Sequence, residues 1–162
     1  MDIVTSSPVL VTGGTGFIAG HIIYNLLEKG YKVRTTVRSG DEASYAYLRN
    51  LINAEENLEI VHADLTDATS LAKAFTGGVQ FVFHVASPYI LKPDNPEETL
   101  MPAAVNGTKA ILELCQSTKT VQKLILTSCT CALSDEFEPN KEYQEDDWNT
   151  TSSLTRNSYA YR

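Results

Sequence analysis

Apolar residues recur along this chain in two patterns, which alternate from the N-terminus to the C-terminus. Short runs rich in apolar and β-branched residues predict buried strands at 9–11, 31–37, 58–62, 79–85 and 121–126. Between them, apolar positions with helical spacing predict helices at 17–27, 66–75 and 97–117, with a weaker helical pattern at 41–54 and a helix beginning at 154–162. Gly30 and the pair Gly77–Gly78 stand where helices are expected to end.

The alternation of strands and helices predicts an α/β protein with a doubly wound parallel sheet, the Rossmann type of nucleotide-binding domain. A length of 162 residues with 43% hydrophobic content is enough for one ordinary core. We therefore expect a single domain over residues 1–162.

Composition narrows the range of partners. The net charge of -7 argues against a nucleic-acid partner, and no apolar stretch is long enough to span a bilayer. The three cysteines, Cys115, Cys129 and Cys131, have no metal-binding or disulfide-framework spacing, which favours a reducing, cytoplasmic setting with no bound metal.

The segment VLVTGGTGFIAG, residues 9–20, combines a short strand, a glycine-rich turn and the beginning of a helix. Amides at the N-terminus of a helix are unpaired and the helix dipole attracts an anion there. Glycines such as Gly13 and Gly16 let a pyrophosphate approach the backbone. The segment therefore predicts a dinucleotide phosphate site. The alternative is a structural turn that binds nothing.

The spacing Gly13-x-x-Gly16-x-x-Ala19, with Phe17 and Ile18 inside it, resembles the extended branch of the short-chain dehydrogenase/reductases, the NAD-dependent epimerase/dehydratase superfamily. Ala19 followed by Gly20 is similar to its dihydroflavonol reductase and cinnamoyl-CoA reductase group. The resemblance implies cofactor contacts at Gly13, Thr15, Gly16, Phe17 and Ile18. Members of that group run to about twice this length. The resemblance therefore also implies that residues 1–162 are the NAD(P)-binding domain in the N-terminal half of such an enzyme, incomplete at its C-terminal end and without the substrate domain.

Arg38 follows the second predicted strand, where a Rossmann-type domain meets the adenosine ribose. An arginine there accommodates a 2′-phosphate, whereas an acidic residue accepts from the free 2′-hydroxyl. No carboxylate occurs in the chain between Arg38 and Asp41, so the predicted cofactor is NADP(H) rather than NAD. The alternative is a solvated arginine at a strand end.

The resemblance implies further cofactor contacts at two other strand ends. Asp64 and Leu65 match the pair that contacts the adenine, and Val85, Ala86 and Ser87 lie where the nicotinamide ribose and phosphates need room. His84, inside the preceding strand, is expected to be a core or supporting residue rather than a catalytic one.

The catalytic residues implied by the resemblance are a serine after the fifth strand and a tyrosine on a later helix. The usual Thr-Ser-Ser reads Thr-Ser-Cys here, so the serine position falls on Cys129, with Ser128 beside it. A thiol is a poorer hydrogen-bond donor than a hydroxyl. Tyr159 fits the tyrosine of Tyr-x-x-x-Lys, whose lysine would be residue 163, just past this sequence. Tyr161 is its rival.

These features predict an NADPH-dependent oxidoreductase that reduces a ketone or aldehyde of a small molecule to an alcohol. The 162-residue chain alone is expected to be a poor catalyst, because Cys129 replaces the serine and the lysine is not included. Two alternatives stay open: an NAD-dependent nucleotide-sugar epimerase or dehydratase, and a noncatalytic NADP-binding module. The sequence specifies neither the substrate nor the oligomeric state.

Overall fold

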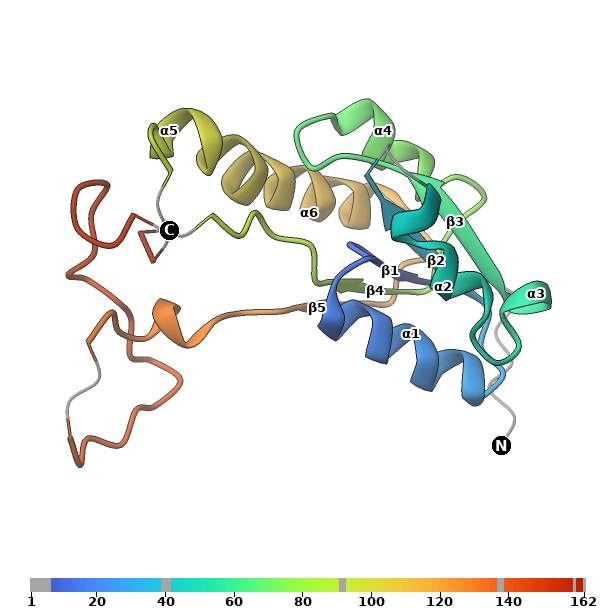
Figure 1. The fold of residues 1–162 in the computed structure, drawn as a ribbon, viewed down its shortest axis with the longest axis horizontal. Coiled ribbons are helices and arrows are strands. Elements are labelled where there is room, and N and C mark those ends of the chain that lie inside the picture. The colour runs from blue at the N-terminus through green and yellow to red at the C-terminus, as the bar shows by residue number, and fades with distance from the viewer. Residues whose placement is uncertain (1–6, 39–41, 91–92, 137–138, 159, 162) are drawn as a thin grey trace.

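The computed structural model describes residues 7–38, 42–90, 93–136, 139–158 and 160–161. Its centre is a five-stranded parallel sheet with strand order β3-β2-β1-β4-β5, shown in Figure 1. The strands are β1 (Val9–Val11), β2 (Val33–Val37), β3 (Leu58–His62), β4 (Phe81–His84) and β5 (Lys123–Leu126). The predicted α/β fold with a doubly wound parallel sheet is confirmed.

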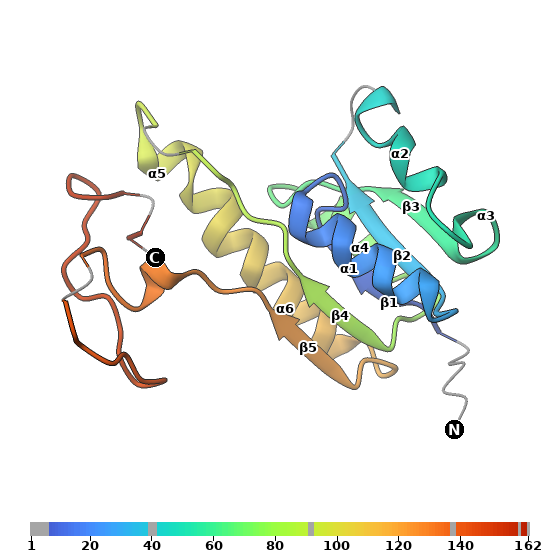
Figure 2. The same ribbon diagram turned by 60° about the horizontal axis from the view of Figure 1, so that its bottom comes forward.

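Helices cover both faces of the sheet (Figures 1 and 2). On one face α1 packs with the short helices α2 and α3 around Val11, Val33 and Val37. On the other face α4 and α6 pack around Leu10 and Val82. The helical elements are α1 (Phe17–Glu28), η1 (Glu42–Ser44), α2 (Ala46–Arg49), α3 (Ala54–Asn57), α4 (Ala68–Lys73), α5 (Pro96–Thr99), η2 (Pro102–Asn106), α6 (Gly107–Ser117) and η3 (Thr130–Ala132). In the described ranges every helix is too short or too polar to cross a membrane.

The end of α1 explains why β2 begins two residues later than expected. Gly30 has a left-handed φ of 78° and its amide donates to the Leu27 carbonyl, while the Tyr31 amide donates to the Leu26 carbonyl. These two bonds form the Schellman motif that closes a helix. Tyr31 thus belongs to the helix terminus instead of the strand.

The helix expected over residues 97–117 is broken into three pieces. A proline has no amide hydrogen and clashes with the preceding turn of an α-helix. At Pro102 the chain accordingly changes from α5 to the π-helical turn η2 before it continues as α6. The helix expected at residues 66–75 is the shorter α4, which begins at Ala68 because the Asp67 carboxylate caps it by accepting hydrogen bonds from the Thr69 and Ser70 amides.

The helix expected at residues 154–162 is not present among the described residues of that segment, which form bends and a turn. Asn157 has a left-handed φ of 52°, which cannot be part of an α-helix. Arg156, just before it, forms ion pairs with Asp135 and Glu136. These contacts hold the segment against the loop after β5, which extends away from the sheet (Figures 1 and 2).

A buried arginine ties the outer strands to the helix layer. Arg34 on β2 is 8% exposed and pairs with Glu59 on β3 at 2.7 Å. Its guanidinium also donates to the carbonyls of Ala74 and Thr76 after α4, at 2.9 and 2.7 Å. These contacts all lie within the fold. The buried Arg34 therefore stabilises the packing of β2 and β3 against the end of α4.

Candidate cofactor-binding site

The candidate site lies at the carboxyl edge of β1 and β4, the two central strands. The chain moves from β1 outward through β2 to β3, and then returns to place β4 on the opposite side of β1. Ligands of open α/β sheets bind in the crevice where the strand order reverses in this way. Thr12 follows β1 at this edge, and Val85, Ala86 and the exposed Ser87 follow β4.

The glycine turn is fixed to the sheet by its own backbone. The Gly13 amide donates to the Thr36 hydroxyl at 3.0 Å, and the Gly14 amide donates to the Thr36 carbonyl at 2.8 Å. Gly13 has a left-handed φ of 77°, and a Cβ built on it would lie 3.0 Å from Ala86. The turn therefore depends on glycine at this position both for conformation and for the close approach of β4.

The outer part of the turn faces solvent. Thr15, Gly16, Phe17 and Ile18 are all exposed, and Gly16, the N-cap of α1, has no side chain to cap the helix. The first amides of a helix lack partners within it and attract anions. A Cβ built on Gly16 would meet only the Gly13 carbonyl, at 3.2 Å, so the space above it is open. The structure thus brings four of the predicted phosphate contacts together at the exposed N-terminus of α1.

Behind the turn, a hydrogen-bond chain joins β1, β4 and α6. The Thr12 hydroxyl accepts from the Val85 and Ala86 amides, both at 3.0 Å, and lies 2.8 Å from Nδ1 of His84. Nε2 of His84 lies 3.3 Å from the Thr108 hydroxyl. Since both acceptor positions of Thr12 are used, its proton must go to Nδ1, which leaves the imidazole proton on Nε2. These linked hydrogen bonds therefore fix the loop after β4 relative to the glycine turn.

His84 is neutral in this setting. The side chain is 2% exposed, and burial lowers its pKa to about 4. A neutral ring is also what the hydrogen-bond chain requires, because Nδ1 has to accept a proton from Thr12. The expectation of a supporting rather than catalytic histidine agrees with this position.

Arg38 and Asp64 lie together at the carboxyl ends of β2 and β3. Arg38 is exposed, and the pKa of Asp64 is lowered chiefly by hydrogen bonds from the Thr66 hydroxyl and amide, with a smaller contribution from the Arg38 charge. Leu65 is covered by α6: a Cβ built on Gly107 would lie 2.8 Å from both its Cβ and its carbonyl oxygen. Arg38 and Asp64 are therefore open to a ligand, whereas Leu65 is held against a helix.

The predicted catalytic residues are only partly visible. Ser128 and Cys129 are exposed beyond the end of β5, and Cys129 directly precedes the short helix η3 as its N-cap. A hydrogen bond from the Cys131 amide lowers the pKa of the Cys129 thiol, whereas burial raises that of Cys131. Tyr159 lies outside the described residues. Tyr161 is described, and it is half-buried.

These pKa shifts predict an order of thiol reactivity. Cys115 is partly buried on α6 and burial raises its pKa, so less thiolate is present there than at the exposed Cys129. At neutral pH, iodoacetamide should modify Cys129 several-fold faster than Cys115. Mass spectrometry of the peptides over time measures both rates, with Cys129→Ser as the control. Faster modification of Cys115 would contradict the arrangement of the β5 end.

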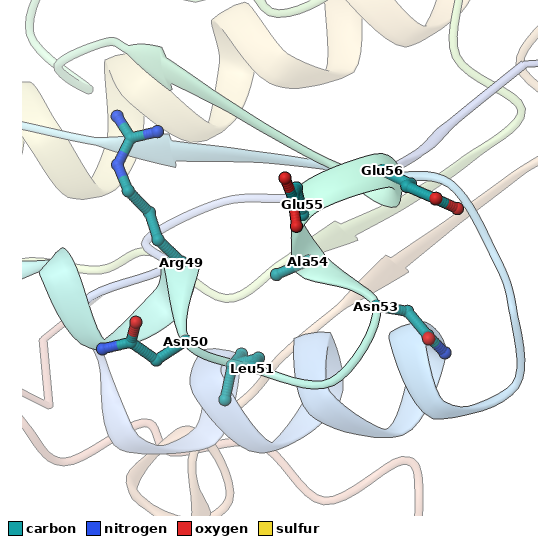
Figure 3. A pocket seen from close by; sticks show the side chains of 7 residues that line it. All are labelled: Arg49, Asn50, Leu51, Asn53, Ala54, Glu55 and Glu56. Atoms are coloured by element: carbon teal, nitrogen blue, oxygen red, sulfur yellow. The ribbon is translucent and has the colours of Figure 1, made fainter.

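A separate hollow lies between α2 and α3, away from this edge. It has a volume of about 360 Å³ and is lined by Arg49, Asn50, Leu51, Asn53, Ala54, Glu55 and Glu56. In Figure 3 the side chains of Arg49, Asn50 and Asn53 point in different directions and do not converge on one point. Throughout the described part of the chain, no three His, Cys, Asp or Glu side chains are grouped so that they could hold a metal ion.

Three side chains at the site have no counterpart in the sequence prediction: Thr12, Thr36 and Tyr47. Thr12 stands directly before Gly13 at the end of a predicted strand, so a polar residue in that place was an available signal. Thr36 and Tyr47 reach the turn from β2 and α2, and their hydroxyls contact Gly13 and Gly14. Spacing along the chain carries no information about such contacts.

Comparisons with known proteins agree with this geometry. The sequence model of the NAD dependent epimerase/dehydratase family matches residues 9–162. Vestitone reductase of Medicago sativa is 40% identical over 148 residues, which cover 90% of this chain and 45% of that protein. The bifunctional dihydroflavonol 4-reductase/flavanone 4-reductase of Malus domestica is 38% identical over 144 residues, or 88% of this chain and 41% of that protein.

Among solved structures, yeast methylglyoxal/isovaleraldehyde reductase Gre2 complexed with NADPH superimposes with a TM-score of 0.78 at 26% identity. The match covers 95% of this chain and 48% of that one. The chain thus spans about half the length of the relatives that it matches.

Proposed function

The chain belongs to the NAD dependent epimerase/dehydratase family, and from this premise we propose that it forms the NADP(H)-binding part of a reductase of ketone or aldehyde carbonyls. Residues 1–162 are one dinucleotide-binding domain in this proposal. The support comes from the reductases among its relatives and from the open phosphate turn at the switch point of the sheet.

The observation that carries the proposal is the position of Arg38. It is exposed at the carboxyl end of β2, in line with the phosphate turn after β1 and with Asp64 after β3. A guanidinium forms paired, charge-assisted hydrogen bonds with a phosphate. Arg38 would hold the 2′-phosphate, Asp64 the adenine, and the amides of Phe17 and Ile18 at the start of α1 the pyrophosphate.

The residues beyond β4 and β5 would surround the reacting end. The bound cofactor supplies the hydride, and this chain supplies orientation and hydrogen bonds. Val85, Ala86 and Ser87 would leave room for the nicotinamide ribose. Ser128 or Cys129 would donate a hydrogen bond to the carbonyl oxygen, and Tyr159 would give it a proton as a general acid.

Cofactor preference tests the proposal directly. NADPH should bind at least about tenfold more tightly than NADH, because Arg38 can form charge-assisted bonds only where a 2′-phosphate is present. Fluorescence titration of both cofactors measures the two dissociation constants. Arg38→Ala should remove the preference and leave NADH binding nearly unchanged. Arg49→Ala, an exposed arginine paired with Glu42, is the matched control and should change neither value.

Equal affinities, or tighter binding of NADH, would overturn the NADP assignment. Tighter NADH binding would instead favour the NAD-dependent epimerase or dehydratase activities of the same family. A noncatalytic NADP-binding module is the second candidate, and the thiol of Cys129 at the serine position favours it. NADPH oxidation with simple aldehydes or ketones separates the two when it is measured on a longer protein that adds the part its relatives have beyond the match, because the 162-residue chain alone is expected to be a poor catalyst in either case. Turnover that Tyr159→Phe removes in that longer protein supports the reductase, and NADPH binding without turnover supports the noncatalytic module.

A further inference from the structure

We propose that Tyr47 is a positioning residue for the phosphate turn, and that it couples the 2′-phosphate end of the cofactor site to the pyrophosphate end. The coupling rests on the proposed function, whereas the positioning concerns the protein alone. Tyr47 belongs to α2, outside the glycine motif and outside every residue so far assigned a cofactor contact.

The first observation is a hydrogen bond across the fold. The Tyr47 hydroxyl donates to the Gly14 carbonyl at 2.9 Å, over a separation of 33 residues. The other sides of Gly14 are already occupied: its amide donates to the Thr36 carbonyl, and a Cβ built on it would clash with the Thr35 side chain. The tyrosine hydroxyl thus completes the fixation of the residue that precedes the exposed amides.

The second observation is the room left for this hydroxyl on α1. A Cβ built on Gly20 would lie 3.3 Å from the Tyr47 hydroxyl oxygen and 3.8 Å from its ring. Contacts this short leave little room for a side chain, so glycine at position 20 lets the tyrosine cross α1 and reach Gly14. Burial raises the pKa of Tyr47, so the phenol keeps its proton as a donor at neutral pH.

The third observation links this contact to Arg38. Arg38 is the first residue after β2, and Tyr47 lies in the same connection between β2 and β3. A phosphate held by Arg38 would therefore restrain the segment that carries Tyr47, and Tyr47 restrains the turn. The two anionic parts of the cofactor would then bind with positive coupling, since each one orders the support of the other.

Tyr47→Phe tests the positioning in the cofactor-free protein, because it removes only the hydroxyl. Amide hydrogen exchange of a peptide covering residues 13–19 should become faster by several-fold, whereas a peptide from α6 should be unchanged. Tyr24→Phe is the matched control: Tyr24 is 40% exposed against 43% for Tyr47, and its hydroxyl donates to Glu28 on its own helix instead of to the turn. Unchanged exchange in the turn of Tyr47→Phe would overturn the positioning role, whether or not the protein binds a cofactor.

A double-mutant cycle on NADPH affinity tests the coupling. Tyr47→Phe should raise the dissociation constant for NADPH about fivefold, the usual effect of one hydrogen bond. In the Arg38→Ala background the same substitution should have a smaller effect, because no bound 2′-phosphate then orders the segment. Equal effects in the two backgrounds would overturn the coupling. Failure of the unaltered protein to bind NADPH would overturn the coupling together with the proposed function, and the exchange result would still decide the positioning.

Discussion

Gly16→Val will fold and will lose dinucleotide binding. The residue has an extended conformation, with φ -79° and ψ 151°, which valine adopts freely. Its Cβ would meet only the Gly13 carbonyl at 3.2 Å, and the position is exposed. The added side chain would occupy the open space in front of the helix amides, where the pyrophosphate is expected. We expect NADPH affinity to fall by about a hundredfold, the effect of a misfit worth a few kcal/mol.

Gly14, in the same turn, provides the control for this variant. A Cβ on Gly14 would clash with the Thr35 hydroxyl, which cannot easily move because it donates to the Val11 carbonyl at 2.7 Å. Gly14→Ala should therefore lower the free energy of unfolding by about 1–3 kcal/mol. Thermal unfolding and fluorescence titration of both variants separate stability from binding. Normal NADPH affinity in a folded Gly16→Val protein would show that the turn serves only the fold.

The sheet could be predicted from local pattern because each of its strands is a short run rich in apolar and β-branched residues. β3 runs from Leu58 to His62 as expected, and the resemblance to the extended short-chain dehydrogenase/reductases is confirmed by the family match over residues 9–162. The glycine turn could be predicted for the same reason: strand, glycines and helix follow one another directly in the chain. In each case the sequence signal is local, although the turn itself is held by residues from β2, α2 and the end of β4.

Features that depend on distant partners could not be predicted in this way. Residues 154–158 do not form the expected helix. Arg156 in this segment instead forms ion pairs with acidic residues about 20 positions earlier in the chain. Arg34 lies in a predicted strand, and nothing in its sequence neighbourhood indicates that its guanidinium donates hydrogen bonds to carbonyls 40 and 42 residues away. The contact of Tyr47 with Gly14 belongs to the same class.

The second large effect that we expect is a loss of stability in acid, caused by His84 and its hydrogen bonds to Thr12 and Thr108. The pKa of His84 is about 4 in the folded protein, against about 6.5 for an ordinary histidine in an unfolded chain. Between these two values the unfolded chain binds a proton that the folded protein does not. The free energy of unfolding should therefore fall as the pH decreases from about 6.5 to about 4, by roughly 1.4 kcal/mol per pH unit and about 3 kcal/mol in total.

Replacement of the imidazole tests whether His84 causes this loss of stability in acid. His84→Asn keeps an acceptor oxygen near the Thr12 hydroxyl but removes the titrating group, so the variant should be less stable at pH 7 and nearly independent of pH from 6.5 to 4.5. Urea unfolding at each pH gives both curves, and the difference between them should shrink as the pH falls. Acidic groups such as Asp64, whose pKa is lowered in the folded state, lose their contribution mainly below this window. Two parallel curves would mean that His84 does not cause the acid sensitivity. A wild-type protein with the same stability at pH 4.5 and pH 7 would mean that the histidine is not held neutral between Thr12 and Thr108.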